Sequence, residues 1–211
     1  MRLETIYNTV LNGDESATED EVKAALEADA EAEEILNQAF IPAMTKVGQL
    51  YETGEKFVPE MLISARAMEA GLAILKPYLV EAGVEPVGRV VLGTVEGDIH
   101  DIGKNLVRMM LEGGGFEVID LGVDVPPADF VEAVAEHHPG FVGLSALLTT
   151  TMPGIEATIK ALEAAGLRKG VTVMVGGAPV TEAFAEEVNA DLYAPDASVA
   201  ASRARALVAA A

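Results

Sequence analysis

Nitrogen and sulfur ligands for a transition metal are scarce in this sequence, which has three histidines and no cysteine among 211 residues. One histidine, His100, follows Asp98 by two residues in the segment EGDIHDIGKNLV. An aspartate at this spacing can accept a hydrogen bond from one imidazole nitrogen, which fixes the tautomer and makes the other nitrogen a better metal ligand. The same pair is also compatible with a helix-capping aspartate beside a surface histidine. Asp98 and His100 are therefore the first candidates for metal chemistry.

Two later segments carry groups suited to a binding site. Four hydroxyl groups lie between Ser145 and Thr151, although Ser145 lacks the GxSxG setting of a nucleophile and hydroxyls here would also cap a helix. Gly176 and Gly177 would let a backbone come close to a flat ligand, or would simply form a strand-to-helix turn. Near His100 there is no GxGxxG or GxxxxGK[ST] motif, so a nucleotide-binding loop is not expected. Lys104 is predicted to be a surface lysine, with a phosphate contact as the rarer alternative.

The elements that must position these groups are predicted by β-branched runs that alternate with helical stretches. We expect strands at 89–95, 116–122, 141–147, 171–177 and 191–194, with helices between them and a last helix at 196–210. Continuous Val, Ile and Leu runs separated by helices indicate a five-stranded parallel sheet of flavodoxin-like or Rossmann-like type. In that architecture ligands bind beyond the carboxyl ends of the strands, where the segments above lie.

The first 80 residues have a helical period instead, and we expect an N-terminal bundle of four or five helices. Thr18 to Glu21 has the pattern of a capping box at a helix start. Pro42 is expected to kink or break a helix, and Pro59 to stand near the start of the last helix. Gly83 and Pro86 mark a linker, which gives predicted domains at 1–85 and 86–211.

The charge argues against several kinds of partner. With 14 basic and 34 acidic residues the net charge is −20, divided as −11 for residues 1–87 (6 basic, 17 acidic) and −9 for 88–211 (8 basic, 17 acidic). Nucleic acids and anionic membranes are bound by Lys and Arg, so neither is expected as a partner. The first residues lack a signal-peptide pattern and no run of 18 apolar residues occurs, so a cytoplasmic location is expected.

The spacing of these motifs is more specific than any one of them. Asp98-x-His100-x-x-Gly103, then Ser145-x-Leu147, then Gly176-Gly177 resembles the cobalamin-binding signature of the corrinoid proteins of methylamine, methanol and methoxyaromatic methyltransferase systems, and of the cobalamin-binding part of methionine synthase. The resemblance extends to the ending NADLYAPDA and, in the helical half, to the stretches from Val47 to Glu60 and SARAME, so that it covers about residues 1–205.

This resemblance implies that His100 is the axial ligand of cobalt, that Asp98 holds its other nitrogen, and that Thr151 replaces a relay serine. The nucleotide tail of the cofactor would enter a slot beside the sheet, and the helical half would cap the corrin with apolar side chains around Met61. The implied cofactor-binding residues are Gly97, Asp98, His100, Asp101, Ile102, Gly103, Ser145, Leu147, Thr149, Gly176, Gly177, Ala178, Tyr193, Asp196 and Met61.

The resemblance further implies a methyl carrier in one-carbon metabolism rather than an independent enzyme. A substrate-specific methyltransferase would methylate cob(I)alamin, and an acceptor methyltransferase would move the methyl group from methylcob(III)alamin to a thiol or a tetrahydrofolate; a reductive activation protein would be a third partner. Two alternatives belong to the same cofactor class: a cobalamin-binding sensor, for which the acidic chain offers no DNA-binding segment, and the corrinoid subunit of a mutase.

Overall fold

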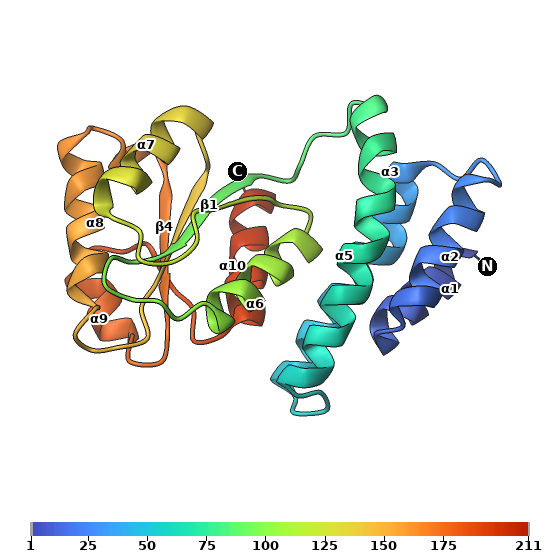
Figure 1. Cartoon of the computed structure of the whole chain (residues 1–211), viewed down its shortest axis with the longest axis horizontal. Coiled ribbons are helices and arrows are strands. Elements are labelled where there is room, and N and C mark those ends of the chain that lie inside the picture. The colour runs from blue at the N-terminus through green and yellow to red at the C-terminus, as the bar shows by residue number, and fades with distance from the viewer. Residues whose placement is uncertain (1, 211) are drawn as a thin grey trace. The chain divides into compact units, whose positions relative to one another are not determined.

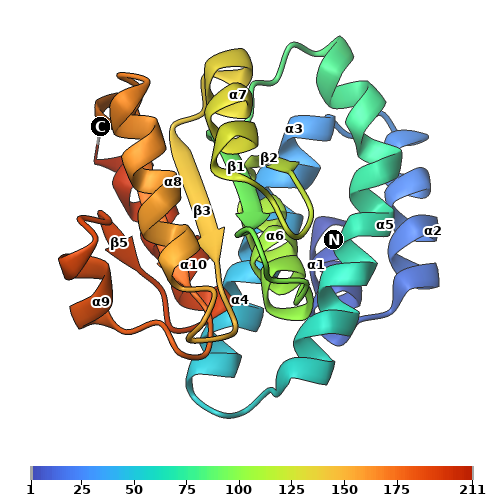
Figure 2. The ribbon, with the colours of Figure 1, turned by 60° about the vertical axis from the view of Figure 1, so that its left-hand side comes forward.

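A computed structural model describes residues 2–210, and the chain forms two compact units. The first unit runs up to Pro86 and also includes Glu112–Gly115; the second consists of Val87–Leu111 and the residues from Phe116 onward. Helices make up the first unit, whereas the second is a sheet flanked by helices (Figures 1 and 2). The domain limits expected from the sequence, 1–85 and 86–211, stay a prediction.

The first unit confirms the predicted helical half. Its helices are α1 (Arg2–Asn12), α2 (Glu15–Leu26), α3 (Ala32–Ile35), α4 (Ile41–Glu52) and α5 (Val58–Glu81), the last with Pro59 in its first turn as expected. Its core is apolar and includes Ile6, Val10, Val22, Ile35, Phe40, Met44 and Met68. Helices α2 and α5 pack closely because Gly71 of α5 has no side chain: a Cβ there would lie 2.9 Å from the Thr18 methyl group of α2, and 2.6 Å from the Phe40 ring.

Two local expectations in this unit need correction. The capping box at Thr18 is wrong, because α2 begins four residues earlier, where the Asp14 side chain accepts the Ala17 N–H; Thr18 is buried inside the helix. Pro42, which was expected to kink or break a helix, does not break it, and a kink there stays a prediction. Between α3 and α4 a π-helical turn, Leu36–Phe40, widens the coil so that the Ile41 N–H bonds to the Leu36 carbonyl, and Pro42, which has no N–H to donate, follows directly in the first turn of α4.

The second unit confirms the predicted parallel sheet. Its strands are β1 (Arg89–Thr94), β2 (Glu117–Asp120), β3 (Phe141–Ser145), β4 (Thr172–Gly176) and β5 (Leu192–Tyr193). All pairs are parallel in the order β2-β1-β3-β4-β5, the flavodoxin-like arrangement. The helices α6 (Ile102–Gly113), α7 (Pro127–His137), α8 (Pro153–Ala164), α9 (Glu182–Glu187) and α10 (Ala197–Ala209) connect and follow the strands.

Both faces of this sheet are covered by helices. Helices α7, α8 and α9 lie on one face and α6 and α10 on the other (Figure 1). The core beneath α7 to α9 is made of valines from β1, β3 and β4 and of large apolar residues from the helices, including Val91, Val142, Val173, Phe130, Ile155 and Ile159. The carboxyl ends of β1 and β3 lie side by side in register, since Thr94 pairs with Ser145, and this register brings the two polar loops together.

Among residues 2–210, none of the helices combines the length and the apolar character that crossing a membrane would require.

Candidate functional site

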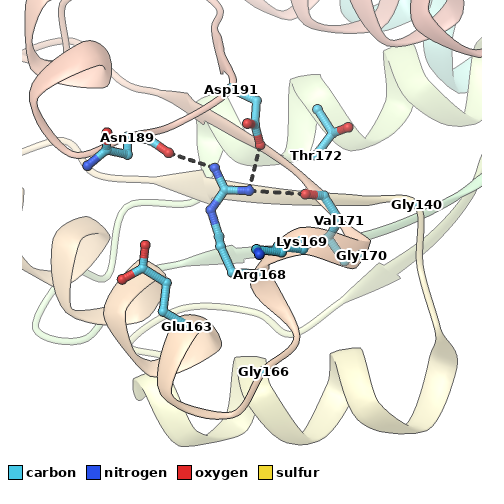
Figure 3. Close-up of a pocket in the computed structure, with 10 residues that line it drawn as sticks. All are labelled: Gly140, Glu163, Gly166, Arg168, Lys169, Gly170, Val171, Thr172, Asn189 and Asp191. Carbon is cyan, nitrogen blue, oxygen red and sulfur yellow. Dashed lines mark hydrogen bonds and ion pairs between the residues drawn. The ribbon is translucent and has the colours of Figure 1, made fainter.

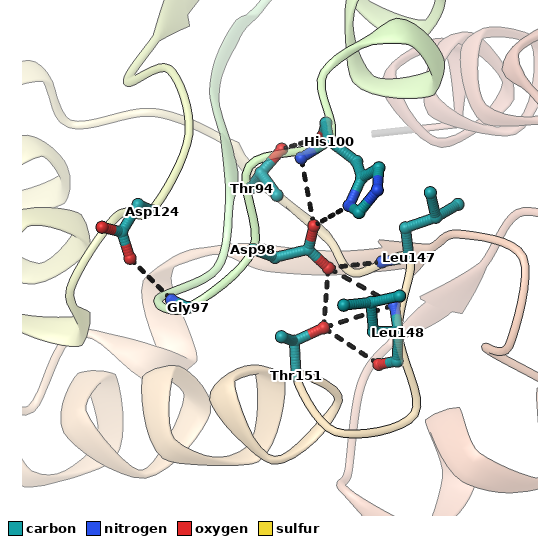
Figure 4. Close-up of polar contacts among 8 residues, drawn as sticks. All are labelled: Thr94, Gly97, Asp98, His100, Asp124, Leu147, Leu148 and Thr151. Atoms are coloured by element: carbon teal, nitrogen blue, oxygen red, sulfur yellow. Dashed lines mark hydrogen bonds and ion pairs between the residues drawn. The ribbon is translucent and has the colours of Figure 1, made fainter.

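The loop between β1 and α6 buries one carboxylate and turns its two oxygens towards different neighbours (Figure 4). The Asp98 residue is 0 % exposed. Its Oδ1 lies 2.7 Å from Nδ1 of His100 and accepts the backbone N–H of the same residue at 3.1 Å. Its Oδ2 accepts the backbone N–H of Leu147 at 2.7 Å and the hydroxyl of Thr151 at 2.6 Å. One carboxylate therefore joins the loop after β1 to the loop after β3.

These donors decide the charge of the carboxylate. Burial alone would raise the pKa of Asp98, but the hydrogen bonds from Thr151, Leu147 and His100 outweigh it and hold the pKa well below the usual aspartate range. An ionised carboxylate only accepts hydrogen bonds, so Nδ1 of His100 must carry the proton. In the neutral ring the lone pair is then on Nε2, and the imidazole side chain is 44 % exposed.

The loop between β2 and α7 is joined to the histidine loop by two hydrogen bonds. The Asp124 carboxylate accepts the Gly97 N–H at 2.6 Å, and the Asp124 N–H donates to the Asp98 carbonyl at 2.8 Å. Asp124 adopts a left-handed φ of 54°, a conformation that aspartate tolerates better than most side chains do. In addition, the Thr94 hydroxyl donates to the His100 carbonyl at 3.0 Å. Thr94 and Asp124 were not among the residues expected from the sequence, although Asp124 follows a strand at the edge where chemistry was expected.

The hydroxyl-rich segment after β3 contributes both backbone groups and one hydroxyl. Ser145 ends β3, and its carbonyl accepts the N–H of Val95 at 3.0 Å. Leu147 gives its amide to Asp98, while its side chain is 40 % exposed. Thr149 lies in an exposed turn, whereas Thr151 is buried and directs its hydroxyl at Asp98. The structure thus brings Leu147 and Thr151 to the Asp98–His100 pair.

The predicted glycines meet different surroundings. At Gly177, whose φ is 124°, an added Cβ would lie 1.9 Å from the Ala146 carbonyl oxygen, and at Gly176 it would lie 2.9 Å from the carbonyl oxygen of Ala194. Both positions therefore need glycine because the backbone packs against them. At Gly103, in the first turn of α6, a Cβ would meet no atom within 4 Å. The protein's own packing does not demand glycine there.

The other expected site residues lie outside the hydrogen-bonded cluster around Asp98. In the second unit, the carboxylate of Asp101 accepts the side-chain amide of Asn105, Ile102 is 74 % exposed, Ala178 is exposed, Tyr193 belongs to β5, and Asp196 caps α10. In the first unit, Met61 is 1 % exposed. Their roles towards a ligand stay predictions.

Lys104 contradicts the expectation of a surface lysine. The residue is 2 % exposed, and its ammonium lies 2.6 Å from each carboxylate oxygen of Asp120 and 2.9 Å from the side-chain oxygen of Asn105. The partner could not be found by spacing, because Asp120 is 16 residues away on the neighbouring strand β2.

The opposite edge of the sheet holds a second polar group, in an open hollow at the amino ends of β3 and β4 (Figure 3). Arg168 donates to the carbonyls of Val171 and Asn189 at 3.2 and 2.6 Å and pairs with the Asp191 carboxylate at 2.8 Å. Asp191 in turn accepts the N–H of Val173 at 2.7 Å. These bonds tie one connection to the next, so we interpret the group as structural.

Comparison with known proteins agrees with the chemistry of the histidine loop. Two family models, each described as a B12 binding domain, match residues 2–76 and 88–203. The dimethylamine corrinoid protein 1 of Methanosarcina acetivorans is 45 % identical over 194 residues, covering 90 % of this chain and 91 % of the relative. The chain belongs to the B12-binding corrinoid protein family.

Solved structures of corrinoid proteins share this fold. A cobalamin-binding protein from Desulfitobacterium hafniense is similar with a TM-score of 0.79 at 36 % identity, covering 97 % of both chains. The methanol:cobalamin methyltransferase complex MtaBC from Methanosarcina barkeri matches with a TM-score of 0.88 at 31 % identity, covering 100 % of this chain and 80 % of that one. The predicted family, fold and cofactor class are confirmed, and the corrinoid relatives do not favour the sensor and mutase alternatives.

Proposed function

We propose that this protein binds a corrinoid through His100 and carries methyl groups between methyltransferases, without catalysing the transfer alone. The observation that carries the proposal is the geometry of one histidine: its Nδ1 is held 2.7 Å from a buried, ionised carboxylate, so that Nε2 faces outward with its lone pair. A single imidazole suits a metal that brings its other ligands in a macrocycle. The residues present therefore fit a cobalt corrinoid.

The chemistry that a bound corrinoid supplies is a cobalt centre able to accept a methyl group and release it again. The protein's share is to orient and to protect. Asp98 fixes the orientation and tautomer of the His100 ring, and Thr151 and the Leu147 amide keep Asp98 in place and ionised. The open space beside Gly103 is consistent with a ligand passing the first turn of α6. Exposed apolar side chains on the two loops and at the start of α6, namely Ile99, Leu147, Leu148 and Ile102, suit an apolar macrocycle face.

The partners follow from the names of the relatives. We infer a substrate-specific methyltransferase as the first partner, because one matching structure is a methyltransferase complex, and a methylated amine as the methyl donor, because the dimethylamine corrinoid protein covers nearly the whole chain. An acceptor methyltransferase that uses a thiol or a tetrahydrofolate, and a reductive activation protein, complete the system as we propose it. The helical unit would be the cap of the corrin, with Met61 among its apolar residues.

The ligand assignment is tested by electron paramagnetic resonance of the protein loaded with cobalamin in the Co(II) state. With histidine labelled by the heavy nitrogen isotope, the nitrogen splitting of the cobalt signal should change, because the axial nitrogen comes from the protein. His100→Ala should lose this response, whereas His137→Ala, at the far end of α7, should keep it. A wild-type signal that ignores the label would refute ligation by His100.

The donor is tested separately, by methyl transfer from a panel of methylated amines and methanol to the loaded protein in the presence of the cognate methyltransferase. Methylation from an amine and not from methanol is expected. Methylation from methanol alone would overturn the amine assignment and leave the carrier function standing.

A further inference from the structure

An ion pair between a buried lysine and a partly exposed aspartate lies in the second unit next to the histidine loop, and it has no part in the function described so far. The side chain of Lys104 is 1 % exposed, and its ammonium contacts both carboxylate oxygens of Asp120 at 2.6 Å. Asp120 ends β2 and its side chain is 26 % exposed. The third contact of the ammonium, with Asn105, stays within the first turns of α6. Each of these three contacts joins the ammonium to an oxygen of the protein.

A buried ammonium contributes little to stability, because its desolvation offsets much of the attraction to its partner. Removing an ammonium from water costs several kcal/mol, and the attraction to one carboxylate often does no more than offset that cost. An apolar side chain of similar length would pack there with less penalty. A geometric role explains the pair better than a gain in stability does, and the known use of buried ion pairs is to fix register.

The hydrogen bonds around the pair form a closed ring through the histidine loop. The Asp120 carboxylate accepts the Gly122 N–H at 2.9 Å, and the Gly122 carbonyl accepts the Thr94 N–H at 3.0 Å. The Thr94 hydroxyl then donates to the His100 carbonyl at 3.0 Å. Lys104, four residues after His100, closes the ring.

These bonds hold both ends of the short segment from His100 to Lys104, which carries the proposed ligand. At one end the His100 carbonyl is fixed to β1 through Thr94; at the other the start of α6 is fixed to β2 through Lys104. The hydrogen bond with Asp98 orients the imidazole of His100. The second set of bonds fixes the backbone of the His100 segment relative to the carboxyl ends of β1 and β2.

We infer that Lys104 and Asp120 form a positioning pair that holds the His100 segment at the distance from the sheet that cobalt ligation needs. The inference rests on the proposed function, since it concerns the same ligand. It assigns to these two residues a task that acts through the backbone of the His100 segment. Loss of the pair should let the segment rise or tilt, so that ligation weakens while the cofactor remains bound through the rest of the site.

The test compares Lys104→Met with Arg89→Met. Arg89 pairs with Glu117 at 2.5 Å at the amino ends of β1 and β2, with side chains 48 % and 49 % exposed. Each variant is loaded with cobalamin in the Co(II) state, and the fraction of molecules with protein nitrogen on cobalt is measured by electron paramagnetic resonance with labelled histidine. Bound cobalamin is quantified by its absorbance, and thermal melting of the cofactor-free protein reports folding.

For Lys104→Met we expect the equilibrium for histidine ligation to weaken about 10-fold, the size typical for lost partners of metal ligands. Arg89→Met should match the wild type. Arg108, whose Nε lies 4.0 Å from Asp120, leaves a cation near the carboxylate in Lys104→Met, which limits the folding cost. If Lys104→Met does not fold, Asp120→Asn serves instead, since it keeps an oxygen for the Gly122 amide and removes the charge.

The outcomes separate the inference from the proposed function. Full histidine ligation in Lys104→Met or Asp120→Asn, with wild-type ligation intact, overturns the positioning role and leaves the function untouched. Equal loss in Lys104→Met and Arg89→Met also overturns it, because the effect would then follow general destabilisation. A wild-type protein without histidine on cobalt refutes the proposed ligand first.

Discussion

Asp98 carries a negative charge at a place where its side chain is shielded from water, and hydrogen-bond donors make this possible. The Thr151 hydroxyl, the Leu147 amide and the His100 ring all point at its two oxygens. Hydrogen bonds to an ionised group are about twice as strong as those between neutral groups, so each donor has a measurable weight. The threonine hydroxyl, which also lies 2.9 Å from the Leu148 carbonyl oxygen, is a donor that a Thr→Val substitution removes at nearly constant side-chain volume.

In the cofactor-free protein, Thr151→Val should lower the free energy of unfolding by about 1–3 kcal/mol near neutral pH, because Asp98 loses a donor at 2.6 Å. The pKa of Asp98 is lowered by folding, so its contribution to stability is present above the unfolded pKa of about 4 and is lost as the pH falls towards the folded value. The difference between wild type and variant should therefore shrink below about pH 4. Urea unfolding across this range measures it.

Thr151→Ser is the matched control, since it keeps the hydroxyl and removes only a methyl group. It should retain the pH dependence of the wild type and lose about 1 kcal/mol at most. A Thr151→Val variant whose deficit stays constant with pH would contradict the role of this hydroxyl in keeping Asp98 ionised.

A substitution at Gly103 can distinguish an effect on stability from an effect on ligand binding. A Cβ at this position meets nothing within 4 Å, so Gly103→Ala should stabilise the cofactor-free protein by about 0.5–1 kcal/mol through better helix propensity. The same variant should bind cobalamin several-fold more weakly, because the methyl group enters the space proposed for the ligand. Thermal melting and titration with cobalamin measure the two effects.

Gly166→Ala is not a suitable comparison for this test, because its φ is 74°, so the control is Gly170→Ala, which also meets open space and lies at the opposite edge of the sheet. It should leave cobalamin affinity unchanged. Wild-type affinity in Gly103→Ala would show that no ligand approaches the first turn of α6.

At the scale of elements, the connections at the amino edge of the sheet provide a prediction that is independent of the ligand. Arg168→Met removes three contacts, two of which, with Asn189 and Asp191, join the turn before β4 to the segment before β5 (Figure 3). It should lower the free energy of unfolding by about 1–3 kcal/mol, because the carbonyls and Asp191 lose a charged donor whose side chain is 16 % exposed. Chemical unfolding measures this loss.

Lys160→Met is the control, since Lys160 makes an exposed pair with Glu156 on α8 and such pairs contribute about 0.5 kcal/mol. Both variants should keep wild-type cobalamin affinity. A loss of affinity in Arg168→Met at unchanged stability would instead give the hollow at this edge a role in binding.

The sequence predicts elements well where one local signal decides them. Buried parallel strands read as unbroken Val and Leu runs, which is why all five were found, and the Asp98–His100 spacing is local in the same sense. The start of α2 was misplaced because both Asp14 and Thr18 have side chains able to cap a helix, and only packing chooses between them. The burial of Lys104 could not be predicted from the sequence, because it depends on the register of β1 and β2, in which Leu92 pairs with Asp120.

At the scale of the whole molecule, the sheet unit contains everything that the proposed ligation needs. The Asp98 network, the Lys104 pair and the large core beneath α7 to α9 all belong to it. The helical unit has a separate core of its own and carries none of these groups. Binding and protection of the corrinoid are therefore expected to be separable tasks, assigned to different parts of the chain.

A truncated chain that begins at Val87 tests this division. It should fold, retain the β2-β1-β3-β4-β5 sheet and bind methylcobalamin through His100, because its core and its site are internal to the second unit. If the helical unit protects the corrinoid as proposed, the methyl form of the truncated chain should lose its methyl group under light, or be oxidised, several-fold faster than that of the full chain. Circular dichroism and cooperative melting establish the fold, and absorbance changes during timed illumination give the rates. Equal rates in the two proteins, at equal cofactor occupancy, would contradict a protective role for residues 2–86 and would leave the ligation by His100 unaffected.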